Sequence, residues 1–590
     1  MNGRQAVALG AEPADLVVRD GRVLTAELAE FRERDVAVAD DRIAALPEDA
    51  SAAVGDDTTV VEADGRAVVP GFVDAHTHAD FFQTIGTAYH RLLEGGTTTV
   101  VSETSALGGA FGAEGVRELL AAAEDLPFAF RATIPVQPFT DTLDDPADEA
   151  TREAVLDLLD DDRVVGVGET DWIHVVGRES PAEVAYDRAR SLGKRVVGHG
   201  AGCSDEDLTA YAGVVDNDHE AIGADEVLER VERGIHPVGR TGSIRDDSEA
   251  FAEALKAHDF DASLSTDGVW PGALADGEAM DGAVRRVIDR GVDPATALRT
   301  ATLGPARHFG LDDRGAVAPG NVADLVVLDD VASVAVDTVV AGGEVVVRGG
   351  EATVGPREHD YPDEFRDSVS VDATPETFRV PATAARDGTV RALEYRHGLI
   401  TTETTVDPAV EGETLAASPD DDVAKAALLD RREGVDDGFV GFLSGLGVEA
   451  GAAATTLTWE ASAVAAVGVD DGAMAAAVER VAEMGGGWAV AGSGGPAEPG
   501  EDGAESPSSE VIAELPMPVA GFATDAPVAE TADGMADVRD ALRSVGVGVE
   551  RPLLAVQTLP FVGVPSLKLT PRGYADVFDR EVVGLTPDAE

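Results

Sequence analysis

The sequence predicts an α/β fold: a (β/α)8 TIM-like barrel with a small split β domain and an additional C-terminal α/β domain. Three observations lead to this prediction. Apolar strand-like runs alternate with helical patterns eight times in the first half of the chain, as expected for a barrel of parallel strands. A strand-like segment at residues 14–18 recurs at residues 323–327. The chain has 590 residues, which is too long for one hydrophobic core.

The repeated segment, Ala-Asp-Leu-Val-Val, predicts the outer part of this organisation. We expect both copies to lie in one small β domain, formed by residues 1–69 and 313–355. The barrel then occupies residues 70–312 between them. Residues 356–385 are acidic and contain proline, which is typical of a linker. Residues 386–590 form the C-terminal domain.

The eight predicted barrel strands each run into a polar residue or a turn. Helical patterns, such as those at residues 114–125 and 181–192, separate them. The strands are expected to end near His78, Glu103, Val136, Glu169, His199, His219, Gly242 and Asp267. Because functional residues in such barrels collect at the carboxyl ends of the strands, we expect the polar side chains among these to share one site.

The first barrel strand carries the clearest chemical signal. Residues 70–78 read Pro-Gly-Phe-Val-Asp-Ala-His-Thr-His, and alternation along a strand places His76 and His78 on one face. A lone histidine is more often a core or surface residue, but this chain has only 11 histidines, and six candidate ligands fall at matching strand ends. An imidazole and carboxylate set of this kind predicts a divalent metal site. The candidates are His76, His78, Glu169, His199, His219 and Asp267.

The composition restricts the class of partner. The formal net charge is −66, and Lys194, Lys256, Lys425 and Lys568 are the only lysines. Acid spread over the whole chain indicates adaptation to a high-salt cytoplasm, and it opposes binding to nucleic acid or anionic membranes. Cys203 alone excludes internal disulfides. Without a signal sequence or a run of 18 apolar residues, we expect a soluble cytoplasmic protein with a small uncharged substrate.

Further motifs connect these observations to a known family. The segment 70–78, the Gly-His at 198–199, the strand-end Asp267 and the split β domain together resemble the amidohydrolase superfamily. Residues 95–102, 198–202, 218–220, 244–248 and 265–267 are similar to those of bacterial and archaeal adenine deaminases. Residues 439–451, 485–488 and 565–570 resemble the C-terminal domain of that family in order and spacing. The resemblance covers almost the whole chain.

This resemblance implies roles for the candidate residues. His76 and His78 would hold one ion and His199 and His219 a second, with Glu169 between them. The resemblance thus implies two ions. It favours Mn2+ or Fe2+, and Zn2+ stays open. Asp267 would bind metal and move a proton from the attacking water to the departing ammonia. Glu169 or Glu220 is the candidate proton donor to the ring. Arg245 and Ser248 would contact substrate, although an ion pair with nearby acids explains Arg245 equally well.

The chain departs from the family pattern around these ligands. Residues 103–106 replace Asp-Pro-His-Glu, residues 80–82 replace Glu-Ser-Ser, and residues 459–463 replace His-Asp-Ser-His-Asn. We therefore expect retained metal chemistry in an altered pocket. The expected activity is hydrolytic deamination of adenine to hypoxanthine and ammonia. Two alternatives stay open: opening of a cyclic amide or attack on another nucleobase, and a catalytically silent protein that binds metal or purine. The oligomeric state also stays open.

Overall fold

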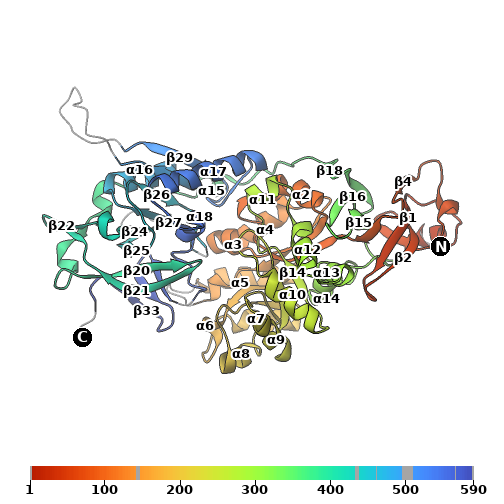
Figure 1. Ribbon diagram of the computed structural model, residues 1–590, viewed down its shortest axis with the longest axis horizontal. Helices are drawn as coiled ribbons and strands as arrows, with labels where there is room; N and C mark the ends of the chain where they lie inside the picture. The colour runs from red at the N-terminus through yellow and green to blue at the C-terminus, as the bar shows by residue number, and fades with distance from the viewer. Residues whose placement is uncertain are drawn as a thin grey trace.

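The computed structural model describes residues 3–140, 147–431, 438–459, 461–493, 509–564 and 566–587. Glu460 and Pro565, which belong to two of the motifs above, lie outside the described residues. Figure 1 shows three layers along the long axis: a β sheet near the N-terminus, the barrel in the centre and a second large sheet on the opposite side. The α/β fold class with these three parts is confirmed.

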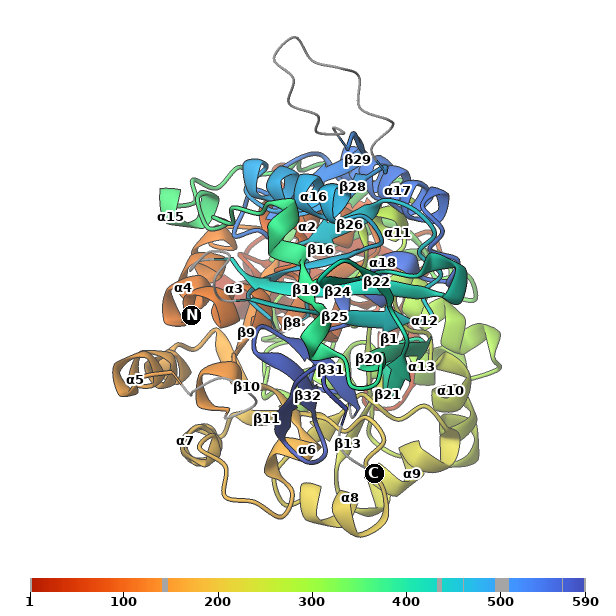
Figure 2. The same ribbon diagram turned by 90° about the vertical axis from the view of Figure 1, so that its left-hand side faces the viewer.

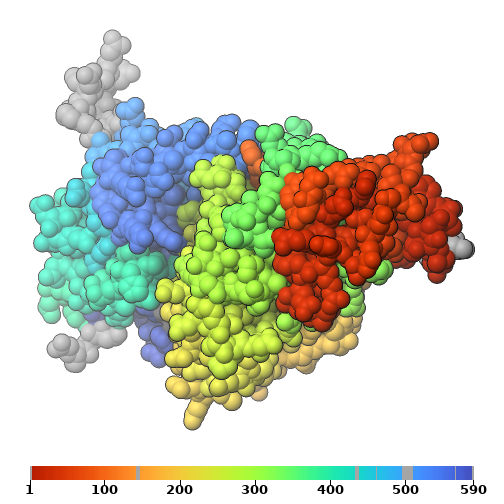
Figure 3. Space-filling model, turned by 45° about the vertical axis from the view of Figure 1, so that its right-hand side comes forward, coloured from red at the N-terminus to blue at the C-terminus, as the bar shows by residue number. Residues whose placement is uncertain are grey.

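The N-terminal sheet has nine strands in the order β18-β17-β16-β15-β5-β1-β2-β3, with β4 paired to β1. Its two repeated segments lie in β1 and β15, so they share one sheet, but β5 lies between them and pairs with both. The space-filling view shows this part projecting from the barrel (Figure 3). The elements are α1 (Gly3–Ala8), β1 (Leu16–Thr25), β2 (Glu30–Ala39), β3 (Arg42–Ala45), β4 (Thr59–Glu62), β5 (Ala67–Pro70), β15 (Leu325–Asp330), β16 (Ala335–Ala341), β17 (Glu344–Arg348) and β18 (Glu351–Ala352).

Eight parallel strands form the central barrel, in the order β14-β13-β12-β11-β10-β9-β8-β6. They are β6 (Phe72–Thr77), β8 (Thr97–Ser102), β9 (Ala129–Ile134), β10 (Val164–Asp171), β11 (Arg195–His199), β12 (Asn217–Asp218), β13 (His236–Arg240) and β14 (Ser263–Ser265). Each ends within two residues of its predicted end. The Asp74 side chain joins β6 to the end of β14, because it accepts hydrogen bonds from the Thr266 backbone N–H at 3.0 Å and its hydroxyl at 2.5 Å.

Helices cover the outside of the barrel because their apolar faces pack on its strands. They are α2 (Ile85–Glu94), α3 (Ser105–Phe111), α4 (Ala113–Ala122), α5 (Glu149–Asp157), α6 (Trp172–Val175), α7 (Glu183–Ser191), α8 (Asp205–Tyr211), α9 (Ala224–Glu232), α10 (Ser248–Ala257), α11 (Pro271–Ala275), α12 (Met280–Asp289), α13 (Pro294–Thr300) and α14 (Leu303–His308). Among the described residues, no helix is both long and apolar enough to span a membrane.

The C-terminal part contains an eight-stranded sheet in the order β21-β20-β25-β24-β27-β26-β28-β29. Figure 2 shows these strands in front of the barrel. They are β20 (Val390–His397), β21 (Ile400–Val406), β24 (Val423–Asp430), β25 (Gly438–Ser444), β26 (Ala452–Thr455), β27 (Ala463–Gly468), β28 (Gly487–Ala491) and β29 (Val511–Pro516). The helices are α16 (Asp471–Glu483), α17 (Val528–Ser544) and α18 (Pro552–Gln557), and a smaller sheet holds β31 (Leu567–Thr570), β32 (Gly573–Asp576) and β33 (Glu581–Val583).

The barrel and the C-terminal part share a core. Strand β7 (Phe82–Gln83), just after the first barrel strand, pairs in parallel with β30 (Ala523–Thr524). The segment expected to be a linker contains α15 (Asp363–Arg366), and its buried Phe365 stacks on Phe111 of the barrel at 4.2 Å. The three minor strands of this region are β19 (Val380–Pro381), β22 (Ala409–Glu411) and β23 (Thr414–Ala416). The domain boundaries themselves stay a prediction.

Candidate metal centre

The six candidate ligands lie together at the carboxyl end of the barrel. His76 lies in β6, Glu169 in β10 and His199 at the end of β11. His78 and His219 directly follow β6 and β12, and Asp267 is the second residue after β14. All six side chains are buried, with no more than 7% of their surface exposed. Parallel strands bring these residues to one end of the barrel because their carboxyl ends all meet there.

The donor atoms form two groups that share Glu169. His76, His78, Glu169 and Asp267 form one group, and Glu169, His199 and His219 form the other; the donor atoms of each lie within 4.8 Å of one another. The Nε2 atoms of His76 and His219 lie 3.3 and 3.2 Å from Glu169 Oε1. The Nε2 atoms of His76 and His78 both lie 3.4 Å from Asp267 Oδ1.

These residues fit a divalent cation. His76 Nε2 is buried and makes no hydrogen bond to any described residue, although two carboxylates face it. Burial lowers the pKa of His76, but Asp267 and Glu169 outweigh it and raise that pKa well above its ordinary value. The carboxylates therefore favour a positive charge between the imidazoles. A divalent metal ion supplies that charge, and imidazoles and carboxylates are ligand types that such ions prefer.

A second set of residues fixes the orientation of the donors. Glu103, at the end of β8, places Oε1 3.6 Å from His76 Nδ1, while its Oε2 accepts hydrogen bonds from Thr133 Oγ1 at 2.9 Å and Glu169 N at 3.1 Å. Such outer partners of metal-binding histidines set ring orientation and ligand basicity. The sequence placed Glu103 at a strand end but not among the six candidate ligands.

The most important residue that sequence reasoning missed is Arg240, at the end of β13. Its buried guanidinium contacts Glu220, Asp247 at 3.0 Å and Asp267 Oδ2 at 3.3 Å. Burial raises the pKa of Glu220, but the charge of Arg240 outweighs it and lowers that pKa to about 2. The only signal in the sequence was an arginine at the end of the seventh predicted strand, two residues before Gly242.

The two predicted substrate contacts lie elsewhere. Arg245 is half exposed and donates to Asp247 at 2.8 Å, which is the ion pair that the sequence left open. Ser248 begins α10, and both its backbone N–H and its hydroxyl donate to Asp246. Neither residue is among those that line the cavity beside the metal ligands. Their contact with substrate stays a prediction.

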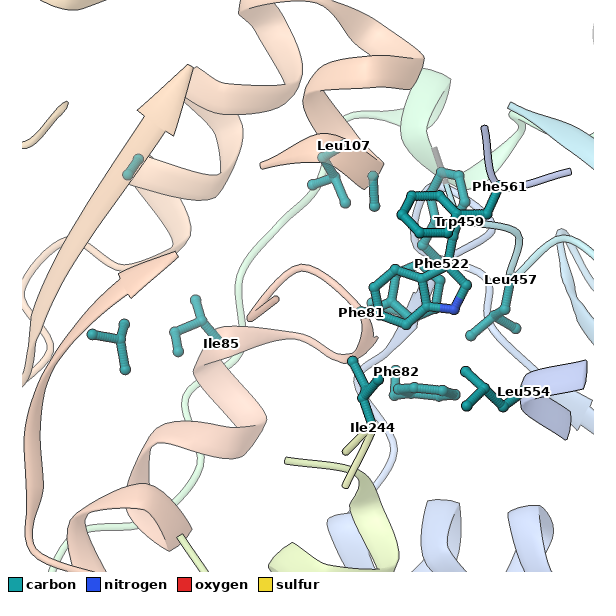
Figure 4. Close-up of a cluster of buried hydrophobic side chains, with 14 of the residues drawn as sticks. Phe81, Phe82, Ile85, Leu107, Ile244, Leu457, Trp459, Phe522, Leu554 and Phe561 are labelled. Atoms are coloured by element: carbon teal, nitrogen blue, oxygen red, sulfur yellow. The ribbon is translucent and has the colours of Figure 1, made fainter. Parts of the chain in front are cut away.

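The C-terminal part of the chain forms one wall of the cavity beside the ligands. Its free volume is about 30 Å³, the space of about one water molecule. Figure 4 shows that Phe81, Phe522, Trp459 and Phe561 cluster at this junction. The cavity is lined by His78, Glu169, His199, His219, Glu220, Arg240, Ile244, Asp267, Leu399, Trp459, Leu554, Thr558 and Phe561.

Comparisons with known proteins agree with this architecture. Residues 67–346 match the model of the amidohydrolase family, and residues 398–581 match the model of the adenine deaminase C-terminal domain. The adenine deaminase of Methanothrix thermoacetophila is 30% identical over 577 residues, covering 97% of each chain. That of Moorella thermoacetica is 32% identical, covering 98% of this chain and 97% of its own. That of Methylobacterium sp. is 33% identical, covering 97% and 98%. The chain therefore belongs to the adenine deaminase family.

Proposed function

We propose that this protein catalyses the metal-dependent hydrolytic deamination of adenine to hypoxanthine and ammonia. The observation that carries the proposal is the set of six buried imidazole and carboxylate donors at the carboxyl end of the barrel, in a chain of this family. Adenine is small and uncharged, which suits a protein with a net charge of −66, since such a charge repels polyanions. The single cysteine fits the proposed cytoplasmic location, where thiols stay reduced.

The residues suit one or two ions. His76, His78 and Asp267 would hold one, His199 and His219 the other, and Glu169 borders both groups. A divalent ion in this position lowers the pKa of a bound water towards 7 and so supplies a nucleophile at neutral pH. Mn2+ or Fe2+ is the proposed ion, with Zn2+ as the alternative, because imidazoles and carboxylates accept all three.

Asp267 is placed to move protons. Its Oδ1 faces His76 and His78, while Arg240 holds its Oδ2 at 3.3 Å, so the carboxylate is fixed in one orientation. We propose that it takes one proton from the water that attacks C6 and delivers it to the departing amino group, which leaves as ammonia.

The second proton of that water goes to the ring nitrogen next to C6, which completes hypoxanthine. Glu220 is the less suitable carrier, because its carboxylate is already paired with the guanidinium of Arg240. Glu169 is the proposed carrier, since it lies between the two donor groups and contacts both His76 and His219.

Release of ammonia from adenine tests the proposal. The metal-free protein is loaded with Mn2+, Fe2+ or Zn2+ in molar KCl, the metal content is measured, and the Asp267→Asn variant is assayed beside it. We expect turnover by the wild type and a loss of at least about 100-fold in the variant. A fully loaded wild type that releases no ammonia from adenine, or that opens a cyclic amide instead, would contradict the proposal.

A further inference from the structure

Three buried polar atoms next to the cavity lack hydrogen-bond partners among the described residues. They are the indole Nε1 of Trp459 and both amide atoms, Oε1 and Nε2, of Gln557. Trp459 is 8% exposed and Gln557 is completely buried. Leaving a buried donor or acceptor unpaired costs about 1–3 kcal/mol, so folded proteins rarely keep such atoms without a reason.

Trp459 lies in the wall that faces the metal ligands, and Gln557 is its neighbour. The Trp459 indole lines the cavity, meets the His78 ring edge-on at 4.9 Å and stacks on Phe81 at 4.9 Å. Gln557 ends α18, and its backbone carbonyl accepts a hydrogen bond from the Trp459 backbone N–H at 3.3 Å.

Helix α18 presents this region to the cavity. Leu554, one turn before Gln557, and Thr558, which follows it, both line the cavity. Figure 4 shows Trp459 between Phe81 and Phe561, with Leu554 and Leu457 on the side of its indole nitrogen. Gln557 itself is not a lining residue, but it lies in the chain between Leu554 and Thr558, which are, so its unpaired amide is buried next to that wall.

The other residues of that wall provide few free hydrogen-bonding groups for a polar substrate. Ile244, Leu399, Leu554 and Phe561 are apolar, and the Thr558 hydroxyl already donates to the Leu554 carbonyl at 2.8 Å. Among the described residues of this wall, Trp459 thus carries an unused hydrogen-bond donor, and its neighbour Gln557 adds an unused donor and acceptor next to the wall. An indole donor and an amide with a neighbouring donor and acceptor match a planar heterocycle.

We propose that Gln557 and Trp459 recognise the purine base, a role that rests on the proposed function. The amide pairs with the base edge that presents an acceptor beside an N–H, which in adenine is the N3 and N9–H edge, furthest from C6. A glutamine amide pairs with adenine through two hydrogen bonds in the same way at its N6 and N7 edge. Trp459, which contacts the ligand His78, donates to N7, the acceptor nearer C6.

Two consequences follow from this arrangement. The protein selects the free base over its nucleoside, because a sugar on N9 removes the N–H that Gln557 Oε1 accepts. The cavity of about 30 Å³ must also widen to admit the base. We expect Trp459 and Gln557 to move away from the metal ligands when the base enters, and their unpaired atoms then form hydrogen bonds to it.

The test compares substrate analogues in matched variants of the full-length, metal-loaded protein. Gln557→Met keeps the side-chain volume and removes both amide atoms, and Trp459→Phe keeps an aromatic ring and removes the N–H. Thr302→Val is the control, because its buried hydroxyl is already paired with the Leu298 carbonyl at 2.7 Å and the residue does not line the cavity. The substrates are adenine, 3-deazaadenine and 7-deazaadenine, and the readouts are kcat/KM, metal content and melting temperature.

We expect Gln557→Met to lower kcat/KM for adenine by about 100-fold, since two hydrogen bonds are lost, and to affect 3-deazaadenine less. Trp459→Phe should cost about 10-fold with adenine and little with 7-deazaadenine. Thr302→Val should resemble the wild type with every substrate. Without substrate, Gln557→Met should keep its metal and melt no lower than the wild type, because it removes two unpaired polar atoms from the interior.

Analogue preferences identical to those of the wild type in both variants would overturn the recognition role while leaving the proposed function intact. If the wild type does not deaminate adenine, the proposed function fails, and equilibrium dialysis with adenine then decides the recognition role. Binding by the wild type that Gln557→Met loses at unchanged metal content supports it. Equal binding by both proteins, or no binding by either, overturns it.

Discussion

Replacing Arg230 with methionine should both destabilise the barrel and weaken metal binding. Arg230 is 1% exposed; its Nε donates to Asp218 Oδ2 at 2.8 Å and its guanidinium reaches the Gly200 carbonyl at 3.0 Å. The other oxygen of Asp218 accepts the backbone N–H groups of Gly200 and Glu220, each at 3.0 Å. These two residues directly follow His199 and His219, so one buried ion pair fixes the spacing of two ligands.

The magnitude follows from the burial of the pair. Methionine leaves the Asp218 carboxylate buried without its counter-charge, which costs about 3–5 kcal/mol. If the barrel unfolds as one unit of roughly 250 residues, each kcal/mol lowers the melting temperature by about 2–4 °C, so we expect a fall on the order of 10 °C. Loss of an outer partner of metal ligands weakens metal binding by about 10–100-fold.

Thermal unfolding and metal titration against a competing chelator measure these two effects. The matched control is Arg188→Met, because Arg188 pairs with Asp160 at the surface, where the side chains are 44% and 56% exposed and the pair contributes at most about 1 kcal/mol. The double variant Arg230→Met with Asp218→Asn should recover part of the stability, since no buried charge is left unpaired. The reasoning is refuted if Arg230→Met melts within about 2 °C of the control and binds metal equally tightly.

Three further predictions concern pH, salt and backbone packing. Burial lowers the pKa of His236 to about 4, whereas an unfolded histidine titrates near 6.5. Between these pH values the unfolded chain binds more protons than the folded chain. The folded state should therefore lose stability as the pH drops from about 6.5 to 4. His236→Gln should flatten that part of the melting curve against pH, and an unchanged slope would exclude His236 as the cause. The net charge of −66 predicts a melting temperature that rises between roughly 0.1 and 2 M KCl; a flat response would count against adaptation to high salt. Finally, a Cβ on Gly242 would meet the Thr266 carbonyl oxygen at 1.6 Å, whereas one on Gly272 would meet nothing within 4 Å. Gly242→Ala should therefore displace the segment that leads to Asp267, lower the stability by about 2 kcal/mol or more and reduce turnover. Gly272→Ala should retain both stability and turnover. Equal behaviour of the two variants in melting and activity assays would show that the backbone can relax.

The metal donors could be predicted because their positions follow from local pattern. Alternation along β6 aligned His76 with His78, and the predicted ends of the strands located Glu169, His199, His219 and Asp267 at one end of the barrel. This reasoning needs only the geometry of a strand and the rule that parallel strands present their carboxyl ends together.

The orientation of those donors could not be predicted in the same way. Arg240 joins Glu220, Asp247 and Asp267, three carboxylates from different loops, and the arginine resembles any other in the sequence. The same holds for the Asp74 contact that connects β6 to Thr266 across 192 residues. Such contacts depend on how strands are staggered around the barrel, which no local periodicity records.

The sequence by itself determined the fold class, the strand ends and the grouping of the six candidate ligands, because these depend on residue type and on spacing along single strands. Only the tertiary structure decided which side chains lie in and next to the cavity. It brought Trp459 onto His78, left Gln557 unpaired beside the cavity and kept Arg245 outside it. The physical reason is that the pocket wall forms where parts of the chain that are far apart in the sequence pack together, and their contact is set by the combined shape of both surfaces.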